Sequence, residues 1–311
     1  MRVAVFGAGS VGAYFGGRLA QAGEDVVFIA RGEHLRAIRD SGLRVDSIKG
    51  DFLIQPAQAV EDPRQVGPVD FVLLCIKAWH VPDAVLAMRP LISESTGVVP
   101  LGNGVDAPAQ IAAVLGTEHT LGGLCQISSM IVEPGHIRHA GVEPFVAFGE
   151  LDRRHSERTE RLRQSFVHAG VKVDVPEDIQ AAMWGKFAFI ASISGVGAVT
   201  RVPAGVMRSV PETRQMLRNA IEEVAAVGRA CKVSLPENIV DQTMSFIDSL
   251  APGVTASMQR DIVAGKPSEL GAQNGAVVRM GLEVGVPTPV HTFIYHSLLP
   301  QELKARGETT Y

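Results

Sequence analysis

Apolar and polar positions follow two different periods along the chain and divide it into two halves. Before residue 176, short β-branched apolar runs alternate with helix-like stretches. This alternation predicts an α/β fold, in which a parallel sheet carries helices on its faces. The predicted strands are Val3–Phe6, Val26–Ile29, Phe71–Ile76 and Gly97–Leu101, and the predicted helices are Val11–Ala22, His34–Asp40 and Val81–Met88.

The next part of the chain has the pattern of antiparallel strands. Turn signals at Pro134-Gly135 and Ala140-Gly141 separate its apolar runs. These predicted strands are Leu121–Val132, Gly135–Ala140 and Glu143–Phe148, and Val171–Val175 is predicted as a last short strand. Acidic and basic residues are densest between Glu150 and Arg163, and this stretch predicts a solvated helix face with internal ion pairs.

From Pro176 onward the patterns are nearly all helical, with proline and glycine between them. Pro176-Glu177-Asp178 is a helix-start signal, because proline and acidic residues favour the first turn. We therefore predict an α/β domain of residues 1–175 and an all-helical domain of residues 176–311. In an enzyme with this arrangement, the reaction is expected between the two domains.

Composition narrows the class of protein. The chain has 311 residues, enough for two domains, with 46% hydrophobic and 20% charged residues, which is typical of globular proteins. The net charge of −4 and the lack of a basic block predict no nucleic-acid partner. Three scattered cysteines predict neither a disulfide framework nor a metal site. No signal peptide or uninterrupted membrane-spanning run is recognised, so a cytoplasmic protein without a membrane partner is expected.

The most informative motif lies at the N-terminus. Gly7, Gly9 and Gly12 have the GxGxxG spacing, directly after a predicted strand and at the start of a predicted helix. There Gly7 permits a tight turn, Gly9 lets a pyrophosphate approach the backbone, and Gly12 lets the helix pack closely. The alternative is an ordinary glycine-rich turn, but the context favours a dinucleotide site.

The end of the second predicted strand indicates which dinucleotide is bound. An acidic residue at this position would bind the ribose of NAD, but the chain has Ala30-Arg31-Gly32 and no acid before Glu33. The guanidinium of Arg31 can instead bind a 2′-phosphate. The alternative is a solvated surface arginine. The missing acid favours NADP, and NADPH is the predicted cofactor.

Two polar residues follow predicted strands, where ligands of open α/β sheets bind. Lys77 ends the run FVLLCIK and could reach a cofactor phosphate or a substrate carboxylate, or simply extend into solvent. Asn103 lies in LGNGVD, where flanking glycines allow close approach to a ligand. An ordinary turn asparagine is the alternative there.

The helical half contains further candidates. Lys186 lies in a strongly apolar helix, where partial burial would lower its pKa toward that of a useful proton donor, or where it could extend to the surface. Ser257 and Asp261 are four residues apart and share a helix face. After a break at Gly265-Lys266-Pro267, Ser268 is expected to cap the next helix, with Glu269 in its first turn. Local helix roles are the alternatives for Ser257 and Glu269.

Taken together, these residues resemble the ketopantoate reductase (2-dehydropantoate 2-reductase) family from end to end. The matching elements are GAGSVG near the N-terminus, Lys77-Ala78-Trp79, Asn103-Gly104, Trp184-x-Lys186, Ser257-Met258-x-x-Asp261-x-x-x-Gly265-x-Pro267-Ser268-Glu269, Asn274-Gly275 and Gly285-Val286-Pro287. The resemblance implies a Rossmann-like domain followed by a helical domain like the C-terminal domain of 6-phosphogluconate dehydrogenase. It is also compatible with a homodimer.

The family reduces a 2-keto acid to a 2-hydroxy acid with NADPH, in pantothenate biosynthesis. By resemblance, Lys186 is the general acid, and Glu269 binds a substrate hydroxyl and stabilises that lysine. Ser257 would bind the substrate carboxylate, Asn103 would position nicotinamide and substrate, and Lys77 would bind cofactor or substrate. The cofactor-binding residues implied are Gly7, Ala8, Gly9, Ser10, Val11, Gly12, Arg31, Lys77, Asn103 and Glu269.

One departure from the family pattern concerns the substrate. Members that reduce ketopantoate commonly have asparagines one and two turns after the lysine, where this chain has Ile190 and Ser194. Because Ile190 offers no side-chain hydrogen bond and Ser194 is shorter, a bulkier or more apolar 2-keto acid is an alternative substrate. A non-catalytic NADPH-binding redox sensor is the alternative outside enzymes.

Overall fold

A computed structural model describes residues 1–309. The chain forms two compact units. The first, here called the α/β unit, consists of Met1–Gly102 and Ala107–Ile179. The second, the helical unit, joins Asn103–Asp106 to the chain from Gln180 onward. Four residues of the loop after the fifth strand of the parallel sheet therefore belong with the helices, a feature that the chain order does not suggest.

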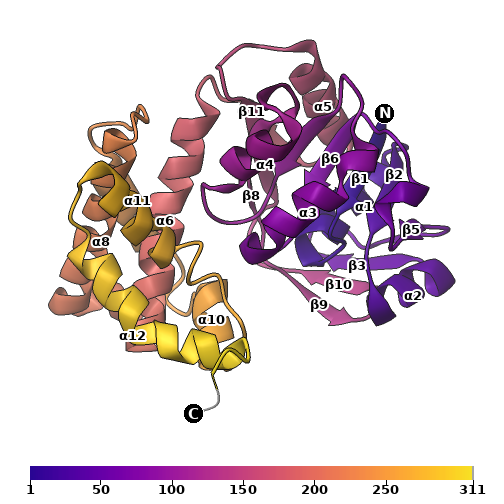
Figure 1. Cartoon of the computed structure of the whole chain (residues 1–311). Coiled ribbons are helices and arrows are strands. Elements are labelled where there is room, and N and C mark those ends of the chain that lie inside the picture. Colours follow the sequence, from indigo (N-terminus) through magenta and orange to yellow (C-terminus); the bar gives the residue numbers. More distant parts are fainter. Residues whose placement is uncertain (310–311) are drawn as a thin grey trace. The chain divides into compact units, whose positions relative to one another are not determined.

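A five-stranded parallel sheet forms the centre of the α/β unit, with the order β5-β2-β1-β6-β7 (Figure 1). Its strands are β1 (Arg2–Phe6), β2 (Asp25–Ile29), β5 (Gln58–Val60), β6 (Phe71–Leu74) and β7 (Gly97–Pro100). The four parallel strands predicted from the sequence are confirmed, although β6 ends two residues before the predicted Ile76. The short strand β5 was not predicted, because three residues are too few to show a period.

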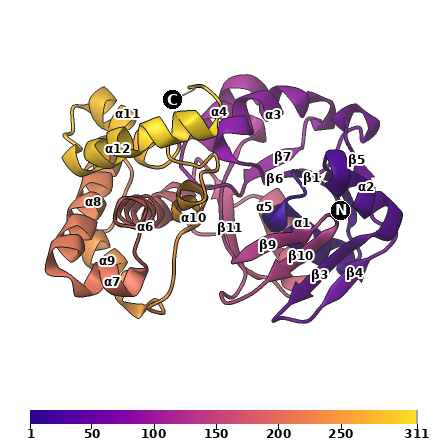
Figure 2. The same cartoon turned by 90° about the horizontal axis from the view of Figure 1, so that it is seen from below.

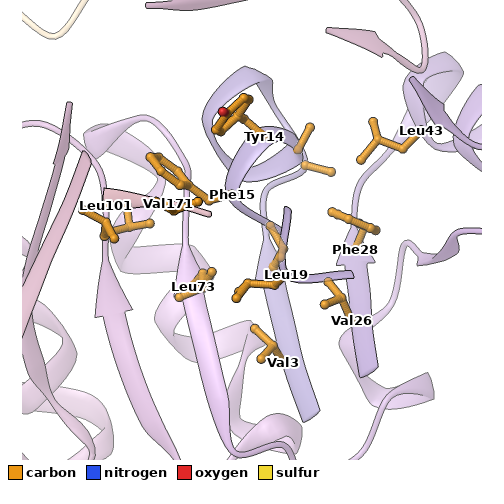
Figure 3. Close-up of a cluster of buried hydrophobic side chains, with 14 of the residues drawn as sticks. Val3, Tyr14, Phe15, Leu19, Val26, Phe28, Leu43, Leu73, Leu101 and Val171 are labelled. Carbon is orange, nitrogen blue, oxygen red and sulfur yellow. The ribbon is translucent and has the colours of Figure 1, made fainter. Parts of the chain in front are cut away.

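Helices cover both faces of this sheet. They are α1 (Ser10–Gln21), α2 (Gly32–Ser41), α3 (Val81–Ala87), α4 (Ala107–Leu115) and α5 (Glu157–His168). Successive side chains of a strand point to opposite faces, so Val3 and Val5 join the core formed with α1 and α5, whereas Ala4 joins the core with α3 and α4. Figure 3 shows Phe15 and Leu19 of α1 above the strands of the first core.

Two smaller sheets complete the α/β unit. One has the order β4-β3-β10-β9 and the other the order β12-β11-β8. Their strands are β3 (Leu43–Ser47), β4 (Phe52–Ile54), β8 (Leu121–Gln126), β9 (Ser129–Glu133), β10 (His136–His139), β11 (Phe145–Glu150) and β12 (Lys172–Asp174).

The predicted antiparallel region is partly wrong. Leu121–Val132 is not one strand, since it supplies the buried β8 and the exposed β9 to different sheets. The turn at Pro134-Gly135 does join the antiparallel pair β9 and β10. The turn at Ala140-Gly141 leads instead to β11, which pairs antiparallel with β8. The polar residues Gln126, Ser128 and Ser129 interrupt the apolar run where the chain crosses from one sheet to the other, and the prediction of a single strand overlooked this break.

The charged stretch from Glu150 to Arg163 is only partly a helix. Helix α5 begins at Glu157, after Ser156, whose side chain accepts a hydrogen bond from the Thr159 N–H. Glu150 ends β11 and is buried, with Arg158 donating to both of its carboxylate oxygens at 2.6–2.7 Å. These bonds from Arg158 and Ser156 hold the pKa of Glu150 below its usual value, against the opposing effect of burial. This acid therefore anchors the start of α5 rather than facing solvent.

The helical unit is built around one long helix. Figure 2 shows α6 almost end-on, with other helices of this unit around it. The helices are α6 (Ile179–Thr200), α7 (Ala204–Ser209), α8 (Pro211–Ala230), α9 (Ile239–Ser249), α10 (Ser257–Val263), α11 (Asn274–Val284) and α12 (Pro289–Ala305). Pro176-Glu177-Asp178 precedes α6 rather than forming its first turn, so this predicted helix start is three residues early.

Helix α6 is apolar on all sides, as expected for a central helix. Among the described residues it is the one helix whose length and composition would suit a membrane span, although 67% of its most apolar window is buried inside the protein. The surrounding core includes Phe187, Ala191 and Val196 of this helix. This burial is typical of a core helix.

The helical unit also contains a buried histidine. His291, in the first turn of α12, has no exposed surface, and neither of its ring nitrogens has a hydrogen-bond partner. The nearest acid is Glu223 of α8, which caps α12 by accepting from the Val290 and His291 N–H groups, with one carboxylate oxygen 3.8 Å from Nδ1. Burial lowers the pKa of His291 to about 3 and raises the pKa of Glu223.

We expect His291 to make the fold sensitive to acid. Between pH 6.5 and about 3 the unfolded chain binds a proton at this ring and the folded chain does not, so stability falls as pH falls. The slope is about 1.4 kcal/mol per pH unit at most. The raised pKa of Glu223 acts in the opposite direction above its ordinary value of 4.5.

Urea unfolding of the wild type and of His291→Leu at pH 7 and pH 5 tests this expectation. The wild type should lose more stability than His291→Leu between the two pH values. The exposed His155→Leu serves as the matched control and should behave as the wild type. An equal loss in all three proteins would exclude His291 as the source.

Candidate functional site

The glycine-rich turn after β1 has the geometry that its spacing predicts. Gly7 has φ +98°, and its N–H and that of Ala8 donate to the Ile29 carbonyl, both at 3.1 Å. A Cβ on Gly7 would lie 2.7 Å from the Cys75 carbonyl oxygen, and a Cβ on Gly12 would lie 2.2 Å from the Gly7 carbonyl oxygen. Neither position has room for a side chain, so the close packing of turn, strand and helix depends on both glycines.

The N-terminus of α1 is open to a ligand. Gly9 is its N-cap residue, and no side chain caps the helix. A Cβ placed on Gly9 would meet no atom within 4 Å. Free N–H groups beside open space, at the positive end of a helix, are what an anionic pyrophosphate requires. The residues present therefore fit the predicted dinucleotide.

Arg31 and Lys77 lie beyond the carboxyl ends of strands in the same unit. Arg31 precedes α2 and is exposed, and no hydrogen bond or ion pair engages its side chain within residues 1–309. Glu33 is the acidic residue of the first turn of α2. Lys77 is exposed, with its Nζ 5.7 Å from the centre of the Trp79 ring. The arginine side chain is thus available to a phosphate.

Three predicted residues lie along one face of α6. Lys186, Ile190 and Ser194 are spaced four residues apart, so they follow one another on successive turns. Lys186 and Ile190 are half-buried, whereas Ser194 is fully buried and its hydroxyl has no hydrogen-bond partner. The helix therefore presents, in order, a cation, an apolar side chain and an unpartnered hydroxyl.

Asn103 and Glu269 are hydrogen-bonded to each other although 166 positions separate them. The amide Nδ2 of Asn103 donates to Glu269 Oε2 at 2.9 Å. Glu269 is 4% exposed, and the same oxygen lies 3.4 Å from the Gln273 amide nitrogen. No hydrogen bond to Oε1 is found among residues 1–309. The carboxylate is thus held through one oxygen, while the other stays available.

Ser268 does not cap a helix, and Glu269 is not in a first helical turn. Helix α11 begins only at Asn274, and Glu269 lies in the preceding turn, with its carbonyl accepting from the N–H groups of Ala272 and Gln273. The Ser268 hydroxyl and N–H donate instead to the Glu302 carboxylate at 2.5–3.1 Å.

The expectation for Ser268 is wrong because the next helix begins six residues later, at Asn274: the Ser268 Oγ accepts from the Leu270 N–H at 3.2 Å within the preceding turn, while its hydroxyl donates to Glu302. Arg306 donates both to Glu302 Oε1, at 2.6 Å, and to the Ser268 carbonyl, at 2.9 Å. Ser268 and Glu302 are buried, and in a low-dielectric interior such charge-assisted bonds are strong. Together they fix the backbone directly before Glu269 to α12.

The segments around Ser257 and Glu269 are both anchored on α6 or its C-terminal extension. Ser257 and Asp261 lie on α10, as predicted, and Gln259 of this helix donates to the Val202 carbonyl at 3.0 Å. At the start of α11, Asn274 donates to the Ala191 carbonyl of α6 at 3.1 Å. Helix α6, which carries Lys186, and the residues directly after it thus also hold the segments that carry Ser257 and Glu269.

Sequence reasoning missed Gln273. This residue is fully buried, and its Oε1 has no hydrogen-bond partner within the described chain. The buried oxygens Ser192 Oγ, Ser194 Oγ and Asn274 Oδ1 share this property. Buried polar atoms are normally paired, so unpaired ones point to water or a ligand. In the sequence, the one signal for Gln273 was its position four residues after the candidate acid Glu269.

Comparisons with known proteins identify the family of the chain. The sequence model of ketopantoate reductase PanE/ApbA matches residues 3–153, and the model of the C-terminal part of that family matches residues 178–302. The 2-dehydropantoate 2-reductase of Mesorhizobium japonicum is 30% identical over 310 residues, covering 93% of this chain and 94% of that protein.

Solved structures show the same fold. The crystal structure of a PanE/ApbA family ketopantoate reductase from Ralstonia eutropha JMP134 has a TM-score of 0.89 at 30% identity, covering 98% of this chain and 100% of that one. D-mandelate dehydrogenase, in a ternary structure with NADH and anilino(oxo)acetate, has a TM-score of 0.88 at 22% identity, covering 98% and 99%. The predicted combination of a Rossmann-like domain and a helical domain is confirmed, and the chain belongs to the ketopantoate reductase family of oxidoreductases.

Proposed function

We propose that this protein reduces a small 2-keto acid to the 2-hydroxy acid with NADPH, and that the substrate is 2-dehydropantoate (ketopantoate), giving pantoate in pantothenate biosynthesis. The observation that carries this proposal is the Asn103–Glu269 pair. A buried carboxylate with one oxygen fixed and the other available suits recognition of a substrate hydroxyl. Its neighbours are anchored on the helix that presents Lys186.

For reduction of a keto acid by a nicotinamide cofactor, the protein needs to bind and orient the reactants and to supply a proton. NADPH, when bound, supplies the hydride that adds to the keto carbon. The carbonyl oxygen then gains negative charge, and a nearby ammonium group can stabilise that charge and donate the proton. We assign this role to Lys186. Ser257 binds the substrate carboxylate, and Glu269 orients both substrate hydroxyl and lysine.

In the α/β unit we assign the dinucleotide to the glycine-rich turn. The uncapped N–H groups of Ser10 and Val11 would bind the pyrophosphate. Arg31 would bind the 2′-phosphate, and Lys77 would bind a phosphate or the substrate. By the family resemblance, Asn103 would also orient the nicotinamide.

The first test is steady-state oxidation of NADPH with ketopantoate, followed by absorbance, with NADH in parallel. Turnover with NADPH and much slower turnover with NADH would support the proposal in full. Binding of NADPH without turnover would contradict ketopantoate as the substrate and leave the cofactor assignment standing.

We expect Arg31→Ala to raise the KM for NADPH about 10- to 100-fold, because one charge-assisted pair to a phosphate is lost. The KM for NADH should stay unchanged, since that cofactor has no 2′-phosphate. The measurement is a pair of saturation curves with each cofactor. Arg36→Ala is a matched control, as this exposed arginine lies further along α2. An equal effect on both cofactors would contradict recognition of the 2′-phosphate.

A second candidate substrate is a bulkier or more apolar 2-keto acid. The observation that favours it is Ile190, a half-buried apolar residue on the face of α6 that carries Lys186. Comparison of kcat/KM for ketopantoate with values for branched and aromatic 2-keto acids decides between the two. A clear preference for ketopantoate would eliminate this candidate.

We also propose a cytoplasmic protein that forms a homodimer. Cys75, Cys125 and Cys231 form no disulfide among the described residues, which fits a reducing compartment. The dimer is inferred from the family resemblance alone, and light scattering after size exclusion tests it.

A further inference from the structure

His34 lies in the first turn of α2 and joins two loops of the α/β unit. Its Nε2 is 2.7 Å from the carbonyl oxygen of Ala8, within the glycine-rich turn. Its Nδ1 is 3.1 Å from the backbone nitrogen of Gly135, in the turn between β9 and β10. The ring is half-buried. One side chain thus connects the predicted pyrophosphate site to a turn about one hundred residues away.

The two partners determine which ring nitrogen carries the proton. The Gly135 N–H can only donate, so Nδ1 must accept from it. In the neutral ring the proton is then on Nε2, which donates to the Ala8 carbonyl. Both contacts are satisfied by this one tautomer.

The bond to Ala8 controls the direction of a neighbouring N–H. The carbonyl of Ala8 and the N–H of Gly9 belong to one planar trans peptide, so they point in opposite directions. With the carbonyl held by His34, the Gly9 N–H must point away from the ring. No hydrogen bond engages this N–H within residues 1–309. Gly9 also caps α1, where no side chain competes for the free N–H groups.

The orientation of the Ala8–Gly9 peptide depends on its hydrogen bond with His34. The N–H groups of Gly7 and Ala8 are fixed on the Ile29 carbonyl, which anchors the chain before the Ala8–Gly9 peptide. After it, the Gly9 carbonyl accepts from the Ala13 N–H at 2.8 Å, so both neighbouring peptides are anchored and His34 makes the hydrogen bond to the Ala8–Gly9 peptide itself. Glycine restricts its own peptide orientation less than other residues do. A side-chain hydrogen bond supplies the missing restraint.

We propose that His34 is a positioning residue of the dinucleotide site, which holds the Ala8–Gly9 peptide so that the Gly9 N–H faces the cofactor pyrophosphate. This inference rests on the proposed function, since it assumes that the turn binds NADPH. A residue that holds a binding group in its bound orientation before the ligand arrives lowers the entropic cost of binding. Such a residue increases affinity without contacting the ligand. Because the ring also accepts from Gly135, the orientation of the turn is tied to the β9–β10 connection.

The test is direct titration of the purified protein with NADPH and NADH, with thermal unfolding and steady-state kinetics of the same variants. His34→Phe keeps the ring volume and removes both hydrogen bonds. We expect its Kd for NADPH to rise about tenfold, the size expected for the loss of one oriented bonding group. The kcat at saturating NADPH and the KM for the keto acid should stay at wild-type values.

Two further variants separate positioning from general stability. His34→Gln keeps an amide donor for the Ala8 carbonyl and should recover most of the affinity. His139→Phe is the matched control, because this buried ring of the same unit bonds to Ser47 and Val142 and packs on Tyr14 of α1, but makes no hydrogen bond to the glycine-rich turn, and phenylalanine keeps the ring. It should lower thermal stability and leave NADPH affinity unchanged.

The outcomes distinguish this inference from the proposed function. If the wild type binds neither dinucleotide, both fail. If the wild type binds NADPH and His34→Phe binds it equally well, this inference alone fails. It also fails if His34→Phe and His139→Phe lose affinity in parallel with their loss of thermal stability, because the effect would then be structural.

Discussion

Replacing Lys186 with alanine should lower kcat by about 10²- to 10⁴-fold, the range typical for the loss of a general acid. Binding of NADPH should remain at its wild-type strength, because the residues assigned to the pyrophosphate and the 2′-phosphate belong to the α/β unit and Lys186 to the helical unit. The expected loss of transition-state stabilisation is about 3 to 5 kcal/mol. Single-turnover reduction of the keto acid measures the chemical step directly.

The physical reason is the charge that develops on the substrate oxygen. Lys186 is half-buried in an apolar helix, and no hydrogen bond or ion pair engages its side chain among residues 1–309. A cation without a protein partner, in surroundings of low polarity, interacts strongly with a developing alkoxide. Alanine removes both the charge and the proton, while the helix remains intact because alanine is a good helix former.

Two further variants make the result specific. Lys186→Arg keeps the charge but cannot give up its proton, so it should restore little of the lost rate. Lys266→Ala removes an exposed lysine of the same unit and should be silent. If Lys186→Ala also left turnover unchanged, the assignment of the proton donor would be wrong. A wild type that binds NADPH but turns over no 2-keto acid would favour the redox-sensor alternative.

The periodicity of the sequence was sufficient for the parallel sheet and for most helices. Helix α1 contains several turns, so its pattern is read reliably, whereas α6 was predicted from its strongly apolar composition. The short strands β4 and β5 have three residues each and show no period. The division of Leu121–Val132 was missed although polar residues at Gln126, Ser128 and Ser129 mark it, whereas the assignment of the two strands to different sheets depends on tertiary packing.

The candidate site could also be predicted only in part from the sequence. The glycine motif and Arg31 are local features, and their positions follow from neighbouring residues. The bonds Asn103–Glu269 and Ser268–Glu302 join residues that are 166 and 34 positions apart. No local pattern indicates such pairs, and the resemblance to a family supplied the first only as a set of unconnected residues. Gln273 was missed because an amide in a turn has many ordinary explanations.

Glu269→Gln should lower kcat/KM for the keto acid by about 10²- to 10³-fold with little effect on folding, because it removes a charge while keeping the shape. Asn103 can still donate to the carboxamide oxygen of the new glutamine, so the fixed side of the residue is preserved. The other side would present an N–H₂ group in place of the free Oε1. An acceptor for a substrate hydroxyl and a partner for a lysine ammonium would both be lost.

The companion variant Asn103→Ala tests the opposite half of the pair. It keeps the charge of Glu269 and removes its 2.9 Å hydrogen bond, so the carboxylate is held only by the longer 3.4 Å contact with Gln273. We expect a smaller loss of kcat/KM, about tenfold. The loss in the double variant should be smaller than the sum of the two single losses, because residues in direct contact couple energetically.

Asp106→Asn is a matched control, since this partly exposed acid of the same loop pairs with Arg279 rather than with Glu269. Strictly additive losses for Asn103→Ala and Glu269→Gln would show that the two side chains act independently, and Glu269 would then owe its role to position in the turn rather than to the asparagine.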